Sequence, residues 1–265
     1  MSDRTTDQTH PSRDESTGAA STEAEFIARA IQRQAEAVAK LADADPSAMS
    51  RAVALVVECA DAGGTVLVSG VGKSGLIGAK ISATLASLGI PSHSVHPTEA
   101  AHGDLGRFGP KDLCLALSYS GETDEVVNLA GILKQDGLPI IAIAKGSDAS
   151  QSSLERLATV ALTVGVGDEA GGSPAPTTST TCTLALGDAL ALAAARRRRF
   201  TDADFAKRHP GGSLGGLLRP VIDALRFRAG DNLPLVPDTH TVAAALNEAA
   251  TQSPRRPGAL MLVDP

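Results

Sequence analysis

The sequence predicts an α/β fold: a five-stranded parallel sheet flanked by helices, followed by the start of a second small α/β module. Five short apolar runs alternate with helical segments, and fully buried parallel strands have this continuous apolar character. Two of the runs lead directly into turns rich in glycine and hydroxyl groups. A last apolar run, "GALMLVDP", follows a change of composition and predicts the second module.

The N-terminal part is predicted to contain a tail and two helices. Residues 1–20 are polar and rich in Ser, Thr and Asp, which predicts a disordered tail. Residues 21–64 have apolar residues at helical spacing, and we expect helices over about 25–41 and 48–60.

The core, residues 65–200, is predicted to alternate strands with helices. The expected strands are Thr65–Ser69, Pro91–Val95, Leu113–Leu117, Pro139–Ala144 and Thr159–Val164, and the expected helices are Gly75–Leu88, one through Val126 and Leu133, and Thr180–Arg197. In such sheets, ligands bind at the carboxyl ends of the strands.

The C-terminal part departs from this alternation. Phe205–Leu218 is rich in glycine and holds a histidine before a proline, so residues 201–220 are predicted to contain a loop. Residues 221–265 are predicted to form a linker and part of a second module, which ends at an apolar strand and therefore looks truncated.

Composition excludes several classes of protein. The net charge of −6 argues against a general nucleic-acid binder, and the basic run Arg196–Arg199 suits the end of a helix. The cysteines, Cys59, Cys114 and Cys182, form no metal or disulfide pattern. No segment resembles a signal peptide or a membrane span, so we expect a cytoplasmic protein with no membrane partner.

The first glycine-rich turn, "SGVGKSG" at residues 69–75, suggests a phosphate ligand. A triphosphate loop needs a glycine where Leu67 stands, and a dinucleotide site needs an acid at the end of the second strand, where Val95-His96-Pro97 stands instead. Both nucleotide interpretations are weak. What remains is a helix N-terminus after a strand, which is an anion site built from backbone N–H groups.

Two further turns carry more hydroxyl groups than one helix cap needs. "SYSGETDE" at residues 118–125 follows the third strand, and five hydroxyl residues, Thr177–Thr181, open the long helix. N-capping or solvation of the helix start is the alternative interpretation. Several hydroxyls beside a glycine favour a polar ligand.

Titratable side chains surround these turns. Lys73 lies in the first loop, Glu122 and Glu125 follow the third strand, and Glu169 precedes the threonine cluster. The segment "HPTEAAHGDLG" adds His96, Glu99, His102 and Asp104, and His209 lies in the late loop. Taken together, these groups indicate an acid–base site beside a phosphate site.

These segments resemble the sugar isomerase (SIS) domain. "SGVGKSG", "HPTEAAHGDLG", "SYSGETDE", "APTTSTT" and "KRHPGGSLG" occur in the order of that family, and over residues 25–220 they look most like its arabinose-5-phosphate isomerases. The resemblance implies a flavodoxin-like fold and makes residues 201–220 an active-site loop. It also implies that residues 221–265 begin a cystathionine-synthase-type (CBS) module.

The resemblance also implies roles for residues. The family's catalytic positions correspond to Lys73, Glu125, Glu169 and His209, and its metal-sensitive histidine corresponds to His102, where zinc or another divalent metal would inhibit. The implied substrate-binding residues are Gly72, Ser74, His102, Ser118, Ser120, Gly121, Glu122, Thr123, Thr177, Thr178 and Ser179. Tyr119 stands where the family often has asparagine.

The implied reaction is reversible isomerisation of D-arabinose 5-phosphate and D-ribulose 5-phosphate, which supplies 3-deoxy-manno-octulosonate for lipopolysaccharide. A carboxylate, Glu125 or Glu169, moves a proton through an enediol, so no redox cofactor is required. The family implies a homotetramer. The alternatives are another SIS isomerase acting on a hexulose or heptose phosphate, a sugar-phosphate sensor without catalysis, and a dinucleotide-dependent oxidoreductase.

Overall fold

The computed structural model describes residues 22–146, 150–209, 220–229, 231–252 and 259–264. The predicted tail at 1–20 and most of the glycine-rich segment after His209 lie outside the described residues. The chain divides into two compact units. The first comprises residues 1–84 and 91–194, and the second comprises residues 85–90 and 195–265, so each is described by itself.

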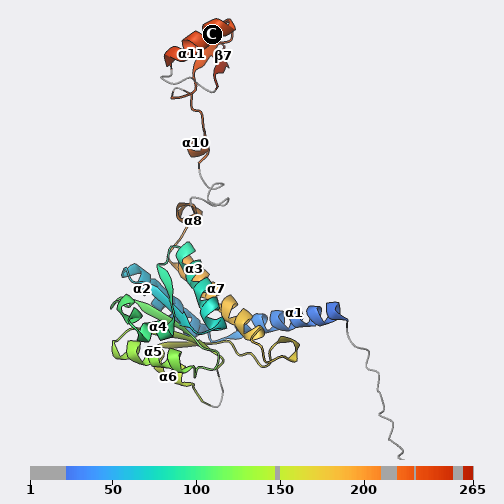
Figure 1. Ribbon diagram of the computed structural model, residues 1–265, viewed down its shortest axis with the longest axis vertical. Coiled ribbons are helices and arrows are strands. Elements are labelled where there is room, and N and C mark those ends of the chain that lie inside the picture. Colours follow the sequence, from blue (N-terminus) through green and yellow to red (C-terminus); the bar gives the residue numbers. More distant parts are fainter. Residues whose placement is uncertain (1–21, 147–149, 210–219, 230, 253–258, 265) are drawn as a thin grey trace, which may run out of the picture. The chain divides into compact units, whose positions relative to one another are not determined.

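The first unit is built on a five-stranded parallel sheet with the order β2-β1-β3-β4-β5 (Figure 1). The strands are β1 (Val66–Gly70), β2 (Ser92–Val95), β3 (Leu113–Leu117), β4 (Ile140–Ala144) and β5 (Val160–Thr163). The expected fold class is confirmed, and each predicted strand agrees with the structure to within one residue at either end. Burial explains this agreement, because every residue of β1, β3 and β4 is buried.

Helices cover both faces of this sheet (Figure 1). The helices of this part of the chain are α1 (Glu23–Lys40), which has no buried residue, α2 (Pro46–Asp61), α3 (Lys73–Ser87), α4 (Pro97–Ala101), α5 (Asp124–Gln135), α6 (Ser153–Leu157) and α7 (Thr178–Arg197), with short 3-10 turns η1 (Leu41–Asp43), η2 (Asp104–Arg107) and η3 (Ala170–Gly172). α3 approaches β1 and β3 closely, since a Cβ on Gly78 would lie 3.1 Å from Val68 Cγ1. α3 and α7 pack together, because a Cβ on Gly187 would meet the Ile81 side chain.

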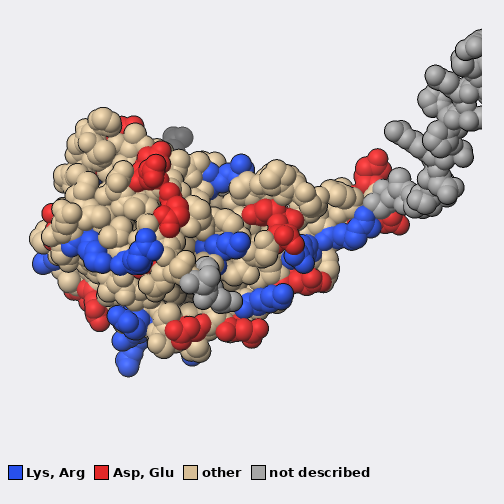
Figure 2. Space-filling model, turned by 90° about the horizontal axis from the view of Figure 1, so that it is seen from below, with Lys and Arg blue, Asp and Glu red and all other residues tan. Residues whose placement is uncertain are grey.

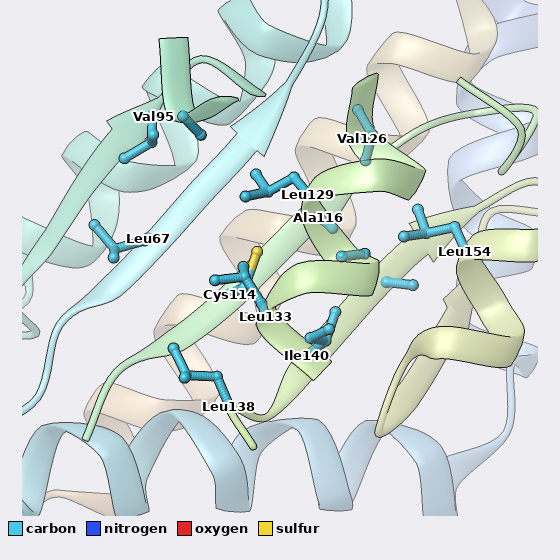
Figure 3. Close-up of a cluster of buried hydrophobic side chains, with 13 residues drawn as sticks. Leu67, Val95, Cys114, Ala116, Val126, Leu129, Leu133, Leu138, Ile140 and Leu154 are labelled. Carbon is cyan, nitrogen blue, oxygen red and sulfur yellow. The ribbon is translucent and has the colours of Figure 1, made fainter. Parts of the chain in front are cut away.

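The opposite face of the sheet carries a core of aliphatic side chains beneath α5 and α6 (Figure 3). Leu67, Cys114 and Ile140 project from the strands, and Leu129 and Leu133 of α5 project toward them. None of the fully buried side chains in the described part is aromatic, as the scarcity of aromatic residues predicts. A rigid aliphatic core of this kind fixes the strand ends where the site is built.

The second unit corrects one prediction. Phe205–Leu218 is expected from its sequence to be a loop, but α8 covers Asp202–Arg208. Thr201 and Asp204 explain the helix, because each side chain accepts a bond from the other's backbone N–H in a capping box. His209 follows as the last described residue of that segment.

The end of the second unit is a small βαβ arrangement. α10 (Val221–Ala224) precedes β6 (Leu235–Pro237), α11 (Val242–Gln252) and β7 (Met261–Val263). β6 and β7 pair in parallel, and Val236, Ala245 and Ala249 form their buried core. The predicted last strand is confirmed, whereas the sequence did not predict β6.

Candidate functional site

The carboxyl ends of the parallel strands bring the predicted turns to one edge of the first unit. β1 leads into α3, β3 leads into residues 118–123, and β5 leads through residues 164–177 into α7. Parallel strands end at the same edge, which is where α/β sheets bind ligands.

The turn between β1 and α3 needs its glycines for reasons of packing. Gly72 has a φ of +58°, which L side chains rarely adopt. A Cβ on Gly75 would lie 2.7 Å from the Gly70 carbonyl oxygen, so the backbone itself fills the space of a side chain. The glycine pattern therefore describes a tight strand-to-helix turn and does not identify a nucleotide.

A cavity of about 190 Å³ lies between the starts of α3 and α7. Its lining comprises Val71, Lys73, Ser74, Ile77, Tyr119, Pro176, Ser179, Thr180 and Thr183. Lys73 supplies the one ammonium group, and four hydroxyls come from the two helices. The cavity is smaller than the roughly 300–1,000 Å³ typical of pockets for drug-sized ligands, so it suits a ligand smaller than a dinucleotide.

The hydroxyls after β3 are engaged with one another. Ser118 Oγ lies 2.8 Å from Thr123 Oγ1 and accepts the N–H of Gly121 at 3.1 Å. Ser120 Oγ accepts the N–H of Glu122 at 3.2 Å. These side chains therefore shape the turn.

Tyr119 joins that turn to the segment before α7. Its hydroxyl donates to the Val166 carbonyl at 2.8 Å, and burial raises the pKa of the phenol. Glu122 is exposed and accepts the Ser153 N–H at 2.8 Å, a bond that lowers the pKa of its carboxyl.

Glu169 holds the start of α7. Its Oε2 accepts the Thr177 N–H at 2.8 Å, the Ser179 N–H at 3.1 Å and the Thr177 hydroxyl at 3.2 Å. Burial raises the pKa of Glu169, but hydrogen bonds from Ser179 and Thr177 outweigh it, so the pKa is lowered. A carboxylate bonded in this way orients the helix and is a weakened base.

This arrangement predicts a pH-dependent contribution of Glu169 to stability. Because its pKa in the folded chain lies below the ordinary 4.5, the stabilisation is present above that pH and is lost as pH falls through the folded value. Glu169→Gln should therefore lower the melting temperature at pH 7, and the difference from the wild type should shrink toward pH 3. Asp168→Asn is the control, because Asp168 is an exposed neighbour whose surface ion pair with Arg33 contributes about 0–1 kcal/mol. A melting-temperature difference independent of pH would contradict this role.

The other predicted site residues do not line the cavity. Glu125 is exposed in the first turn of α5, and His102 is exposed at the end of α4. Thr178 is fully buried, and its hydroxyl has no hydrogen-bond partner. In the second unit, His209 stacks on Phe205 with ring centroids 3.9 Å apart, and its Nε2 lies 3.3 Å from Ser87 Oγ.

Five lining residues were not predicted as binding residues: Val71, Ile77, Tyr119, Pro176 and Thr183. Helical spacing could have found two of them. Ile77 lies four residues after Lys73, and Thr183 lies four residues after Ser179, so each pair shares one face of its helix. Thr180 follows Ser179 directly within the predicted hydroxyl cluster.

The described residues provide no ready metal centre. No group of three or more His, Cys, Asp or Glu side chains in them could hold a metal ion. Metal binding at His102 stays a prediction. No described helix is long and apolar enough to cross a membrane. On the face in Figure 2, basic and acidic side chains are interspersed.

Comparison with known proteins identifies relatives. The SIS domain family matches residues 59–193. Arabinose 5-phosphate isomerase KdsD of Escherichia coli strain K12 is 47% identical over 194 residues, which cover 72% of this chain and 57% of the relative. Arabinose 5-phosphate isomerase KpsF of Escherichia coli is 43% identical over 184 residues, covering 69% and 56%. The chain thus spans little more than half the length of these curated relatives.

A solved structure has a similar fold. The structure of Escherichia coli CFT073 c3406 in complex with arabinose 5-phosphate aligns with a TM-score of 0.65 and 36% identity. The alignment covers 71% of this chain and 97% of that chain.

Proposed function

The chain belongs to the SIS domain family, and on this premise we propose that it interconverts D-arabinose 5-phosphate and D-ribulose 5-phosphate. The observation that carries the proposal is the cavity whose lining combines Lys73 with hydroxyl residues from two helices. The identity to the KdsD and KpsF isomerases supports the choice of substrate.

The cavity suits a phosphorylated sugar for two reasons. Backbone N–H groups at the start of α3 favour an anion, which a phosphate group provides. The hydroxyls of Ser74 and Ser179 can donate to or accept from sugar hydroxyls. The hydroxyls of Thr180 and Thr183 donate to the carbonyls of Thr177 and Ser179 at 2.8 and 2.9 Å, so they can accept from a sugar hydroxyl.

The proposed chemistry is a proton transfer between neighbouring carbons. A general base removes the proton next to the carbonyl, gives an enediol, and returns the proton to the adjacent carbon. We assign the base to Glu125, because the carboxylate of Glu169 is held by three hydrogen bonds at the start of α7. Glu125 does not line the cavity, so this assignment requires the sugar to extend from the cavity toward the start of α5. Lys73 stabilises the negative charge that develops on the enediolate oxygen. The hydrogen moves as a proton, so the reaction requires no redox cofactor.

We propose that the chain acts as a homo-oligomer, with the tetramer that the family resemblance implies. α1 supports an assembly, because none of its residues is buried and Phe26, Ile27 and Ile31 are exposed on it. Light scattering at micromolar concentration tests this, and a monomer mass contradicts it.

We also propose a cytoplasmic location and assign β6, α11 and β7 to the start of a CBS module. The three cysteines support the location, because all are buried free thiols and free thiols persist in a reducing compartment. The βαβ arrangement of residues 235–263 supports the module. The sugar-phosphate product would serve 3-deoxy-manno-octulosonate synthesis.

Turnover of purified protein tests the function. We expect conversion of arabinose 5-phosphate to ribulose 5-phosphate without added NAD, and in deuterated water we expect deuterium at the carbon next to the carbonyl. The same assay with a hexulose 6-phosphate and a heptose 7-phosphate separates the related isomerases. The proposal would be overturned if the protein converted one of those sugars and converted neither arabinose 5-phosphate nor ribulose 5-phosphate.

A further inference from the structure

A second cavity lies in the second unit and shares no residue with the one described above. It measures about 460 Å³ and is lined by Gly89, Arg198, Phe200, Asp204, Lys207 and Arg208. Pockets that hold small organic ligands typically measure about 300–1,000 Å³. None of these six residues takes part in the proposed isomerisation.

The end of α7 builds one wall of this cavity. Arg199 has a φ of +56° and is the one described residue other than glycine with a positive φ, so the chain turns sharply there. Phe200 then packs against the backbone at Gly89, where a Cβ would lie 2.6 Å from its ring. Arg198 Nη1 donates to the Gly89 carbonyl at 3.0 Å, which fixes its guanidinium in the wall.

Helix α8 gives the cavity lining an excess of positive charge. Asp204 is the one carboxylate in the lining, and it accepts the Thr201 N–H at 3.1 Å and the Thr201 hydroxyl at 2.7 Å. It also lies 3.5 Å from Lys207 Nζ. Arg208 forms no ion pair within the described part of the chain. Three cations therefore share the lining with a single, already engaged carboxylate.

We propose that this cavity binds a small phosphorylated molecule. Arg198, Lys207 and Arg208 hold the phosphate, and the ring of Phe200 contacts the organic part. Guanidinium groups match the geometry of phosphate oxygens in paired hydrogen bonds. A concave site of this volume suits a metabolite, in contrast to the extended basic surface that a nucleic acid needs.

Titration calorimetry on the full chain tests the proposal, with phenyl phosphate and inorganic phosphate as probes. The variant Lys207→Gln/Arg208→Gln should raise the Kd for phenyl phosphate at least about tenfold, since charge-assisted bonds are lost. The control Arg51→Gln/Lys111→Gln removes the same charge from exposed positions outside the cavity and should change Kd less than about twofold. Phe200→Leu should raise the Kd for phenyl phosphate more than the Kd for inorganic phosphate.

Two outcomes would overturn the proposal. One is the absence of phenyl phosphate binding to the wild type in low salt, and the other is an equal loss of affinity in the double variant and in its control. The variant Lys73→Met tests this proposal independently of the proposed function. It should abolish most turnover of the pentose phosphates and leave the binding of phenyl phosphate to the second cavity unchanged. Melting curves of each variant verify that it is folded.

Discussion

Replacing Glu125 with glutamine is expected to lower kcat for the pentose-phosphate interconversion by about a hundred- to ten-thousand-fold. Glutamine preserves the shape of the side chain and removes its basicity, so KM should change little. Incorporation of solvent deuterium should fall in parallel with kcat, because the same group removes the proton. Steady-state rates and mass spectrometry of the product measure both effects.

Asp124→Asn is the matched control for this change. Asp124 and Glu125 are neighbours in the first turn of α5, and both are exposed. Either substitution removes one negative charge from the same helix start, where carboxylates interact with the helix dipole. Near-native turnover in Glu125→Gln would exclude Glu125 as the base, and Glu169 or His209 would then be the next residue to replace.

Replacing Lys73 with methionine is expected to lower kcat/KM by about a hundred- to a thousand-fold, because loss of a group that stabilises transition-state charge has effects of this size. Lys73 supplies the ammonium group of the cavity. Methionine retains much of the apolar stem, so the loss reports mainly on the charge. The turnover assay measures it directly.

Lys80→Met is the control from the same helix. Lys80 is also exposed on α3, but it pairs with Asp188 of α7 and lies outside the cavity lining. Surface ion pairs contribute about 0–1 kcal/mol, so this variant should retain near-native turnover. Equal losses in Lys73→Met and Lys80→Met would mean that α3 needs its charge for stability, and Lys73 would lose its assigned role.

The centre of the sheet could be predicted because β1, β3 and β4 are buried on both sides. A strand such as Leu113–Leu117 has no polar position, and its apolar run shows its limits directly. Short elements with mixed sequence gave no such signal. Leu235–Pro237 has three residues and ends in proline. The start of α8 is marked in the sequence only by the spacing of Thr201 and Asp204, and the helix is seven residues long.

The sequence predicted where the candidate site lies, at the carboxyl ends of the strands, but it predicted only some of the residues that line the cavity. Lys73, Ser74 and Ser179 line the cavity as expected. Ser118 and Thr123 have the same side-chain chemistry, but they bond to each other. Hydrogen-bond partners depend on rotamers and on loop packing, and neither is encoded in the spacing of residues along the chain.

The close approach of Gly75 to the Gly70 carbonyl has a consequence for how protein families diverge. A crowded turn of this kind tolerates only glycine, whichever ligand lies above it. Ancestral sequences could therefore change substrate while keeping this signature intact, by replacing side chains on the facing helix, such as Ser179 and Thr183. Selection for a new ligand would alter the residues of α7, while the glycine pattern would stay the same and would indicate the fold and not the ligand.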